Sequence, residues 1–187
     1  RSSKTVWLLG DSHAMVLLNG IRRVARNNQA TLRVVTRPAT AFPQPQNYFK
    51  LNKYDKKNGM LSARLIRQLN TELLRQVSKG DIVIIAQRFM FHFGPDTFEN
   101  WEEDFAYVSN EGKSIDGSKR KFFGDWLNET DNLGMLLKSK GASLIIMGPV
   151  PEWENGKAFC IKQWYNLSSC RQLRTDQDKL HQQSLED

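Results

Sequence analysis

The sequence contains little cysteine and no long hydrophobic run. Only two of its 187 residues are cysteine, and a chain of this size buries roughly 70% of the surface that its unfolded form exposes, so its core needs no disulfide. No apolar segment approaches the roughly 18 residues of a membrane span. Residues 1–4 carry no apolar centre of a signal peptide. Because a strand-like run begins almost at once, we expect a domain of a longer protein, whose targeting signals lie elsewhere.

The sequence also lacks the patterns typical of a metal site and of a nucleic-acid-binding surface. Histidine and cysteine do not cluster at metal-ligand spacing, so no metal or other cofactor is expected. The formal net charge of +7 favours anionic surroundings. However, apart from the cluster at 119–121, the basic residues are scattered, without the aromatic interleaving of an RNA-binding surface. We therefore expect a solvated basic face and no nucleic-acid partner.

Hydrophobic patterning predicts strands that alternate with helices. Short apolar runs predict strands at residues 5–9, 31–36, 81–86 and 143–147. Amphipathic spacing predicts helices at residues 14–26, 61–77 and 121–140. The three-proline stretch 38–45 and the long aromatic stretch 88–119 are interpreted as loops. This order predicts one α/β domain, a three-layer α/β/α sandwich with a mainly parallel sheet, whose reactive groups gather at the carboxyl ends of the strands.

Gly10, Asp11 and Ser12 directly follow the first predicted strand. At a strand-to-helix turn a serine hydroxyl projects outward, and backbone N–H groups point toward whatever binds there. The alternative is that Asp11 and Ser12 only cap the helix that follows. A nucleophilic serine also needs a histidine base that a carboxylate orients.

The segment 8–14, Leu-Leu-Gly-Asp-Ser-His-Ala, resembles the opening block of the SGNH (GDSL-like) hydrolase superfamily. It is most similar to SGNH domains fused to membrane-embedded acyltransferase family 3 proteins, which O-acylate bacterial cell-surface polysaccharides. Other features agree with that subgroup along the whole chain: the proline-containing loop after the second strand, the segments 86–89 and 149–151, and the pair Cys160 and Cys170.

The resemblance implies an SGNH-like fold over residues 1–187, with the superfamily's last strand missing from the predicted elements. It implies Ser12 as the catalytic nucleophile, with Gly10 and Asp11 beside the oxyanion or substrate. Superfamily members usually carry an Asn after the third strand, whereas Gln87 and Arg88 stand here. Arg88 is expected to take over the electrostatic task of that Asn, because a guanidinium offers five donors to an ester carbonyl or an acidic sugar. The alternative is an ordinary arginine at a strand end.

The superfamily also ends with an Asp-x-x-His block that supplies the base and its orienting carboxylate. One match exists, Asp178 and His181, in a polar stretch that is interpreted as a helix. On a helix these two side chains share a face and can pair, either as the catalytic pair or as a solvated pair. The alternative is that the true block lies beyond residue 187. His92 is a lesser candidate base and is interpreted as part of an aromatic loop.

Cys160 and Cys170 lie in a polar segment, close enough in the chain for a disulfide to form without strain. A bridge between them would indicate an oxidising compartment. Two free thiols in a cytosolic protein are the alternative.

Two functions from different classes follow. The first is serine-dependent O-acyl transfer or ester hydrolysis on a bacterial cell-surface polysaccharide or peptidoglycan. The resemblance adds an acyl-accepting glycan and an acyl-donating transmembrane domain of the parent chain as partners, and an extracytoplasmic location. The second is a non-catalytic glycan-binding or scaffold module with an incomplete triad. Its sugar-stacking residues would be tryptophans: Trp101, Trp126, Trp153 and Trp164.

Overall fold

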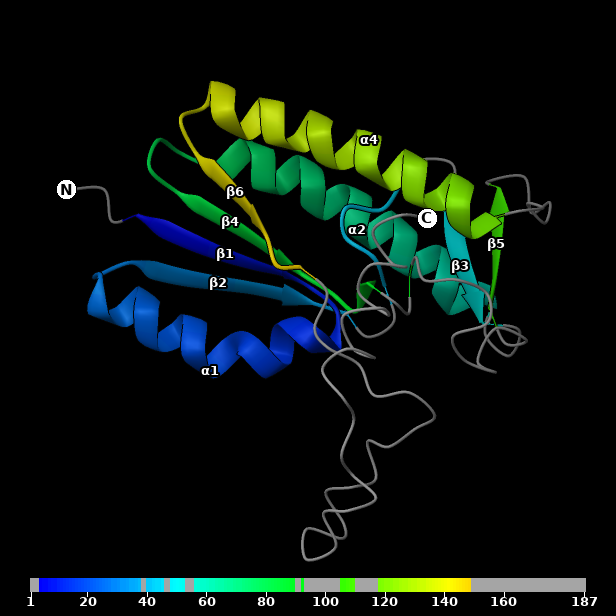
Figure 1. Cartoon of the computed structure of the whole chain (residues 1–187), viewed down its shortest axis with the longest axis horizontal. Helices are drawn as coiled ribbons and strands as arrows, with labels where there is room; N and C mark the ends of the chain where they lie inside the picture. Colours follow the sequence, from blue (N-terminus) through cyan, green and yellow to red (C-terminus); the bar gives the residue numbers. More distant parts are fainter. Residues whose placement is uncertain are drawn as a thin grey trace, which may run out of the picture.

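The computed structural model describes residues 4–37, 40–45, 48–52, 56–89, 92, 105–109 and 118–148. These residues form a parallel sheet with helices on both of its faces (Figure 1). Among them, no helix is both long enough and apolar enough to cross a membrane.

The central sheet has four strands in the order β2-β1-β4-β6. The strands are β1 (Thr5–Gly10), β2 (Thr31–Thr36), β4 (Ile82–Ala86) and β6 (Ser143–Ile146). All three neighbouring pairs are parallel, so the carboxyl ends of all four strands lie along one edge. The predicted parallel sheet is therefore confirmed, and its four strands are those expected from the four apolar runs.

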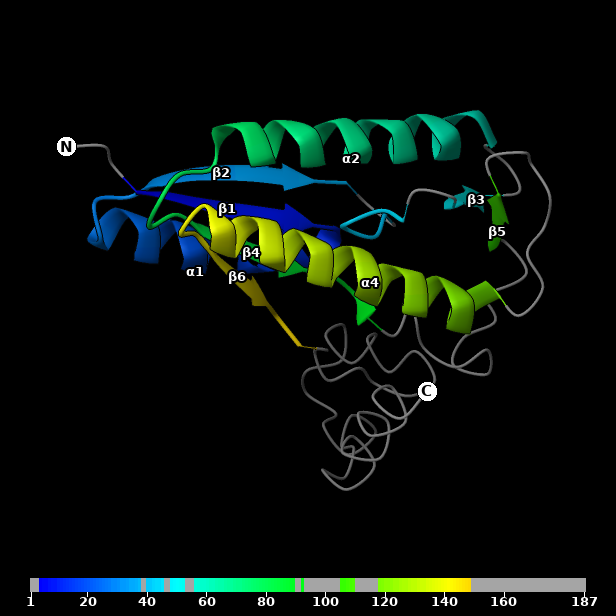
Figure 2. The ribbon, with the colours of Figure 1, turned by 90° about the horizontal axis from the view of Figure 1, so that it is seen from above.

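Helices cover both faces of this sheet, as a three-layer sandwich requires. The helix α1 (Ser12–Asn27) lies on one face, and α2 (Lys56–Gln76) and α4 (Ser118–Ser139) lie on the other (Figure 1). Seen from above, α2 lies nearer β2 and α4 nearer β6 (Figure 2).

The strand residues alternate between two cores because successive side chains of a strand point to opposite faces. In β1, Val6 and Leu8 pack with the apolar side of α1, whereas Trp7 and Leu9 pack with α2 and α4. Strands covered on both faces read as continuous apolar runs, which is why the runs were visible in the sequence.

A second, two-stranded sheet corrects one prediction. The strands β3 (Tyr48–Asn52) and β5 (Phe105–Ser109) pair antiparallel, and β5 lies inside the stretch 88–119 that was expected to be loop. That expectation is wrong at β5. The run Phe-Ala-Tyr-Val-Ser has strand-forming residues, but its partner lies far away in the chain, and local patterning carries no information about such a pairing.

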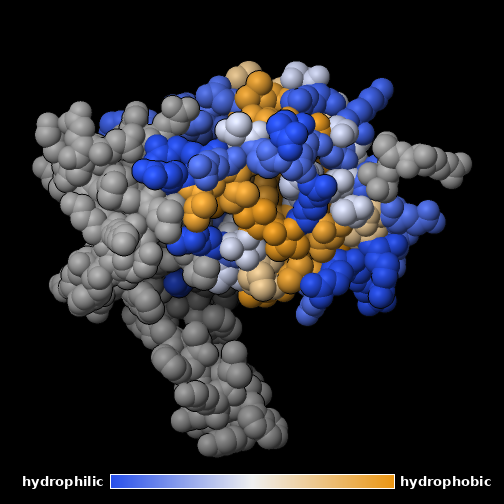
Figure 3. All heavy atoms as spheres, turned by 180° about the vertical axis from the view of Figure 1, so that it is seen from behind, coloured by the Kyte–Doolittle hydropathy of each residue, from blue (hydrophilic) through white to orange (hydrophobic). Residues whose placement is uncertain are grey.

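Hydrophobic side chains also reach the surface. The view from behind shows a band of them between hydrophilic residues (Figure 3). On α1, Val16 is 80% exposed and Val24 is 57% exposed. Exposed apolar residues of this kind are ordinary in folded proteins, so they do not by themselves mark a site.

Candidate active site at the carboxyl edge of the sheet

Gly10 ends β1 in a backbone conformation that other residues rarely adopt, with φ at 148°. A Cβ atom at this position would lie 1.7 Å from the carbonyl oxygen of Ala86, at the end of β4. Only glycine allows the two strand ends to approach so closely. The turn after β1 is thereby held directly against the segment that follows β4.

Ser12 is the first residue of α1, and it is exposed. Asp11 is the N-cap, and its Oδ1 accepts a hydrogen bond of 2.8 Å from the backbone N–H of His13. The capping interpretation therefore holds for Asp11, while the Ser12 side chain is left at the surface. The backbone N–H of Ala14 donates to the carbonyl of Asp11. Within the described residues, no hydrogen bond involves the N–H of Ser12.

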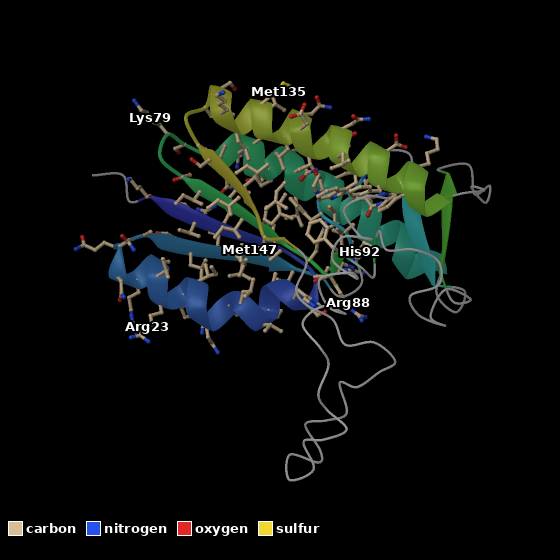
Figure 4. The ribbon with its side chains drawn as sticks, in the orientation of Figure 1. Arg23, Lys79, Arg88, His92, Met135 and Met147 are labelled. Carbon is tan, nitrogen blue, oxygen red and sulfur yellow. The ribbon has the colours of Figure 1, made fainter. Side chains whose placement is uncertain are left out.

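The carboxylate of Asp11 joins three separate parts of the chain. Its Oδ2 accepts hydrogen bonds from the backbone N–H of Arg88 at 2.9 Å and lies 2.9 Å from Nε2 of His92. Asp11 is 1% exposed and His92 is fully buried. Arg88 and His92 lie together beyond the end of β4, beside the first turn of α1 (Figure 4). The buried Asp11, which contacts His92, thus directly precedes the exposed Ser12 at the start of α1.

This network keeps Asp11 ionised. Burial opposes the charge of the carboxylate. The hydrogen bond and charge of His92, with the backbone N–H groups of Arg88 and His13, outweigh that effect and hold the pKa of Asp11 below its ordinary value of 3.8. Asp11 therefore acts as a hydrogen-bond acceptor in the folded protein over the whole neutral range.

Gln87, which stands near the position of the superfamily's Asn, is turned into the protein. It is 1% exposed, and its Oε1 accepts a hydrogen bond of 2.8 Å from the backbone N–H of Phe42. The carbonyl of Phe42 in turn accepts a hydrogen bond of 3.0 Å from Nε1 of Trp126. Gln87 thus holds the loop after β2, and Arg88, which is only partly buried, is left at the edge of the site.

Four of the predicted site residues lie together at this edge: Gly10, Asp11, Ser12 and Arg88. The remaining ones fall outside the described residues, namely Asp178, His181, Cys160 and Cys170. Their predicted roles therefore stay predictions.

One part of the glycan-binding alternative is wrong. Trp126 is 2% exposed, and its indole N–H is bonded to the backbone, so its ring packs in the core and cannot stack on a sugar. The other three tryptophans of that hypothesis lie outside the described residues.

His92 makes a long-range contact that the sequence does not predict. It was interpreted as part of an aromatic loop, yet its imidazole meets Asp11 across 81 residues of chain. A signal was present, because His92 follows Arg88 by four residues at the carboxyl end of a buried strand, where reactive groups gather.

Metal-ligand clusters and a surface hollow were also sought near this site. Among the described residues, no group of three or more His, Cys, Asp and Glu side chains is arranged to hold a metal ion. A hollow of about 580 Å³ lies at the opposite edge of the sheet, where Lys4, Val24 and Gly80 are among the residues that line it. It is therefore separate from Ser12.

Comparison with known protein families identifies the family of this chain. A family model described as "SGNH domain (fused to AT3 domains)" matches residues 1–186. No curated protein matches the chain.

Proposed function

The chain belongs to the family of SGNH domains fused to AT3 domains, and on this basis we propose that it transfers or hydrolyses O-acyl groups, acetyl above all, on a bacterial cell-surface polysaccharide or peptidoglycan. Family membership supports an esterase or acyltransferase activity in general. The glycan, the transfer step and the residues that follow are part of the proposal.

One observation carries the assignment of the nucleophile. Ser12 is exposed at the first turn of α1, where Asp11 and Gly10 hold the backbone against the end of β4. The N–H of Ser12 and the positive end of the helix point toward a group bound at this turn. Arg88 adds a permanently charged guanidinium at the same edge.

The reaction follows from these groups. Oγ of Ser12 attacks the ester carbonyl carbon, and its proton passes to a histidine base. The N–H of Ser12 and the Arg88 guanidinium stabilise the negative charge on the carbonyl oxygen of the tetrahedral intermediate. When the intermediate collapses, the C–O bond to the alcohol breaks and the base returns the proton to that alcohol. In the second half, water or a sugar hydroxyl attacks the acyl carbon while the base takes its proton, and the bond from that carbon to Oγ of Ser12 breaks as the base returns the proton to Oγ.

We propose His181 as this base and Asp178 as the carboxylate that orients it. The support is the Asp-x-x-His spacing together with the family membership. The chain has only three histidines. Of these, His92 is already bonded to Asp11 through Nε2.

The proposed partners follow from the family. The fusion to AT3 domains named by the matching model supports an acyl-donating membrane domain in the same protein and an extracytoplasmic position for this domain. An oxidising compartment would further be supported by a Cys160–Cys170 disulfide. Intact mass before and after reduction and alkylation decides that point, and two free thiols in natively purified protein would argue against it.

Hydrolysis of a chromogenic acetyl ester tests the proposal. Replacing Ser12 by Ala is expected to lower kcat/KM by about 10⁴- to 10⁶-fold, and replacing His181 by Ala to lower it comparably, since members of a triad act as a unit. The matched control is Ser143→Ala, an exposed serine at the opposite edge of the sheet, which should leave the rate unchanged.

The outcomes separate the parts of the proposal. Loss with both variants supports Ser12 and His181 together. Loss with Ser12→Ala alone, measured in this chain or in a longer parent chain, supports Ser12 and overturns His181 as the base. If Ser12→Ala hydrolyses the ester as fast as the unmodified protein, the serine mechanism is wrong. If the unmodified protein itself does not hydrolyse the ester above the uncatalysed rate, in this chain or in a longer parent chain, the non-catalytic glycan-binding function takes its place.

A further inference from the structure

We propose that His92 is a positioning residue for this reaction, which acts through Asp11 to hold the Ser12 turn and the Arg88 backbone in one fixed arrangement. The inference rests on the proposed function, because it concerns the same site. It assigns a role to a histidine outside the Asp-x-x-His pattern.

The first step is the sharing of one carboxylate among distant parts of the chain. Oδ1 of Asp11 accepts a hydrogen bond from the backbone N–H of His13 in α1. Oδ2 accepts one from the backbone N–H of Arg88 and one from Nε2 of the His92 imidazole. His13 directly follows Ser12, and Arg88 carries the proposed guanidinium, so both bonded N–H groups belong to residues at or beside the proposed oxyanion donors. A rotation of the Asp11 side chain would therefore release both of them at once.

The second step is the need for an imidazole. Asp11 is 1% exposed, and a buried carboxylate is stable only where hydrogen bonds replace its lost water. The two backbone N–H groups approach different oxygens. Nε2 of His92 adds a second donor at Oδ2, so that the plane of the carboxylate is set by three donors rather than two.

The third step separates this role from that of a base. A general base must reach the serine proton within hydrogen-bond distance. His92 is fully buried and its Nε2 already meets Asp11, whereas Ser12 is exposed. His92 thus acts on the reaction through Asp11. His13 is the other imidazole near this carboxylate, with Nδ1 3.7 Å from Oδ1.

Amide hydrogen exchange in this 187-residue chain tests the arrangement without any substrate. In His92→Leu we expect the amides of Arg88 and His13 to exchange at least about tenfold faster, because their acceptor is no longer held. In His92→Gln the side-chain amide can still donate to Asp11, so protection should return. The internal control is the amides of Thr5 and Ser78, which donate to Asp81 at the other edge and should not change.

Kinetics provide the second readout. His92→Leu is expected to lower kcat for the acetyl ester by about 10²-fold with little change in KM, since misplaced oxyanion donors weaken binding of the transition state alone. His92→Gln is expected to restore most of that loss. A pattern of localised exchange, lowered kcat and rescue by Gln supports the inference.

Three results would overturn it. Unchanged exchange at Arg88 and His13 in His92→Leu would show that Asp11 does not need the imidazole. Equal acceleration at all four amides would show a general loss of stability. Localised exchange with an unchanged kcat would remove the link to the reaction. Failure of the proposed function is recognised separately, by full activity of Ser12→Ala. The amide-exchange results for the His92 variants do not depend on that activity.

Discussion

Two buried aspartates, Asp11 and Asp81, lie at opposite edges of the central sheet, and each accepts hydrogen bonds from two backbone N–H groups. At the amino edge, Asp81 is 4% exposed and accepts hydrogen bonds from the backbone N–H of Thr5 at 2.7 Å and of Ser78 at 3.0 Å. At the carboxyl edge, Asp11 likewise accepts from two backbone N–H groups of separate segments. Each carboxylate ties the end of one strand to a neighbouring turn.

The surroundings of the two aspartates differ. Asp11 has the imidazole of His92 as a further partner and lies directly before the exposed Ser12. Asp81 lies after a short turn at the far edge, the edge marked by Lys79 in Figure 4. A carboxylate that bridges backbone amides is therefore not in itself a sign of a site. The added histidine and the exposed helix start distinguish the carboxyl edge.

The strongest test of this comparison is Gly10→Ala. An alanine Cβ would lie 1.7 Å from the carbonyl oxygen of Ala86, which is backbone and cannot move aside cheaply. We expect a loss of more than about 4 kcal/mol in the free energy of unfolding, or no folded protein. Urea denaturation followed by circular dichroism measures it. A fully stable Gly10→Ala would show that the two strand ends are not held together as described.

The paired variants Asp11→Asn and Asp81→Asn compare the two carboxylates directly. An Asn side chain can accept one backbone hydrogen bond, but its NH₂ group then faces a second N–H donor. Each variant is expected to lose about 1–3 kcal/mol of stability.

Only Asp11→Asn should also lower the hydrolysis of the acetyl ester, by about 10²-fold, because only that carboxylate holds the Ser12 turn. Denaturation and steady-state kinetics on both proteins check this. Equal losses of activity in the two variants would remove the distinction between the edges.

The pH dependence of stability sharpens the comparison for Asp11. Its pKa is lower in the folded protein than in the unfolded chain, so its ionisation adds stability above about pH 4 that is lost as the pH falls through the folded-state pKa. The imidazoles of His92 and His13 and the backbone N–H of Arg88 face this carboxylate.

The stability gap between the unmodified protein and Asp11→Asn should therefore narrow below about pH 4. Denaturation at pH 7, 5, 4 and 3 measures this gap. Asp125→Asn, in the surface pair of Asp125 with Lys121, is the control and should show a small gap at every pH. A gap that widens as the pH falls would contradict the assignment.

Gly80→Ala, at the amino edge, is the control for Gly10→Ala and has the smallest expected loss of stability. Gly80 also has a positive φ, 86°, but the nearest atom to a new Cβ is 3.4 Å away, on the flexible side chain of Lys4. Without a backbone clash, the cost should be only the conformational strain, about 1 kcal/mol. Thermal and urea unfolding beside Gly10→Ala measure the difference, and equal losses at the two glycines would refute the close approach at Gly10.

The local elements of the fold were predictable because they depend on neighbouring residues. Buried parallel strands appear as apolar runs, and α1, α2 and α4 appear through helical spacing of their apolar residues. The strand β5 was missed because its partner β3 is distant in the chain.

The candidate site divides in the same way. The sequence by itself determined the turn of Gly10, Asp11 and Ser12, and the parallel direction of the strands, which places Arg88 at the same edge, since both follow from local patterning and the alternation of strands with helices. Only the tertiary structure decided that Asp11 is a buried acceptor for His92 and that Trp126 is a core residue. Those contacts join segments 81 and 84 residues apart, and side chains separated in this way meet only after the sheet and its covering helices have packed.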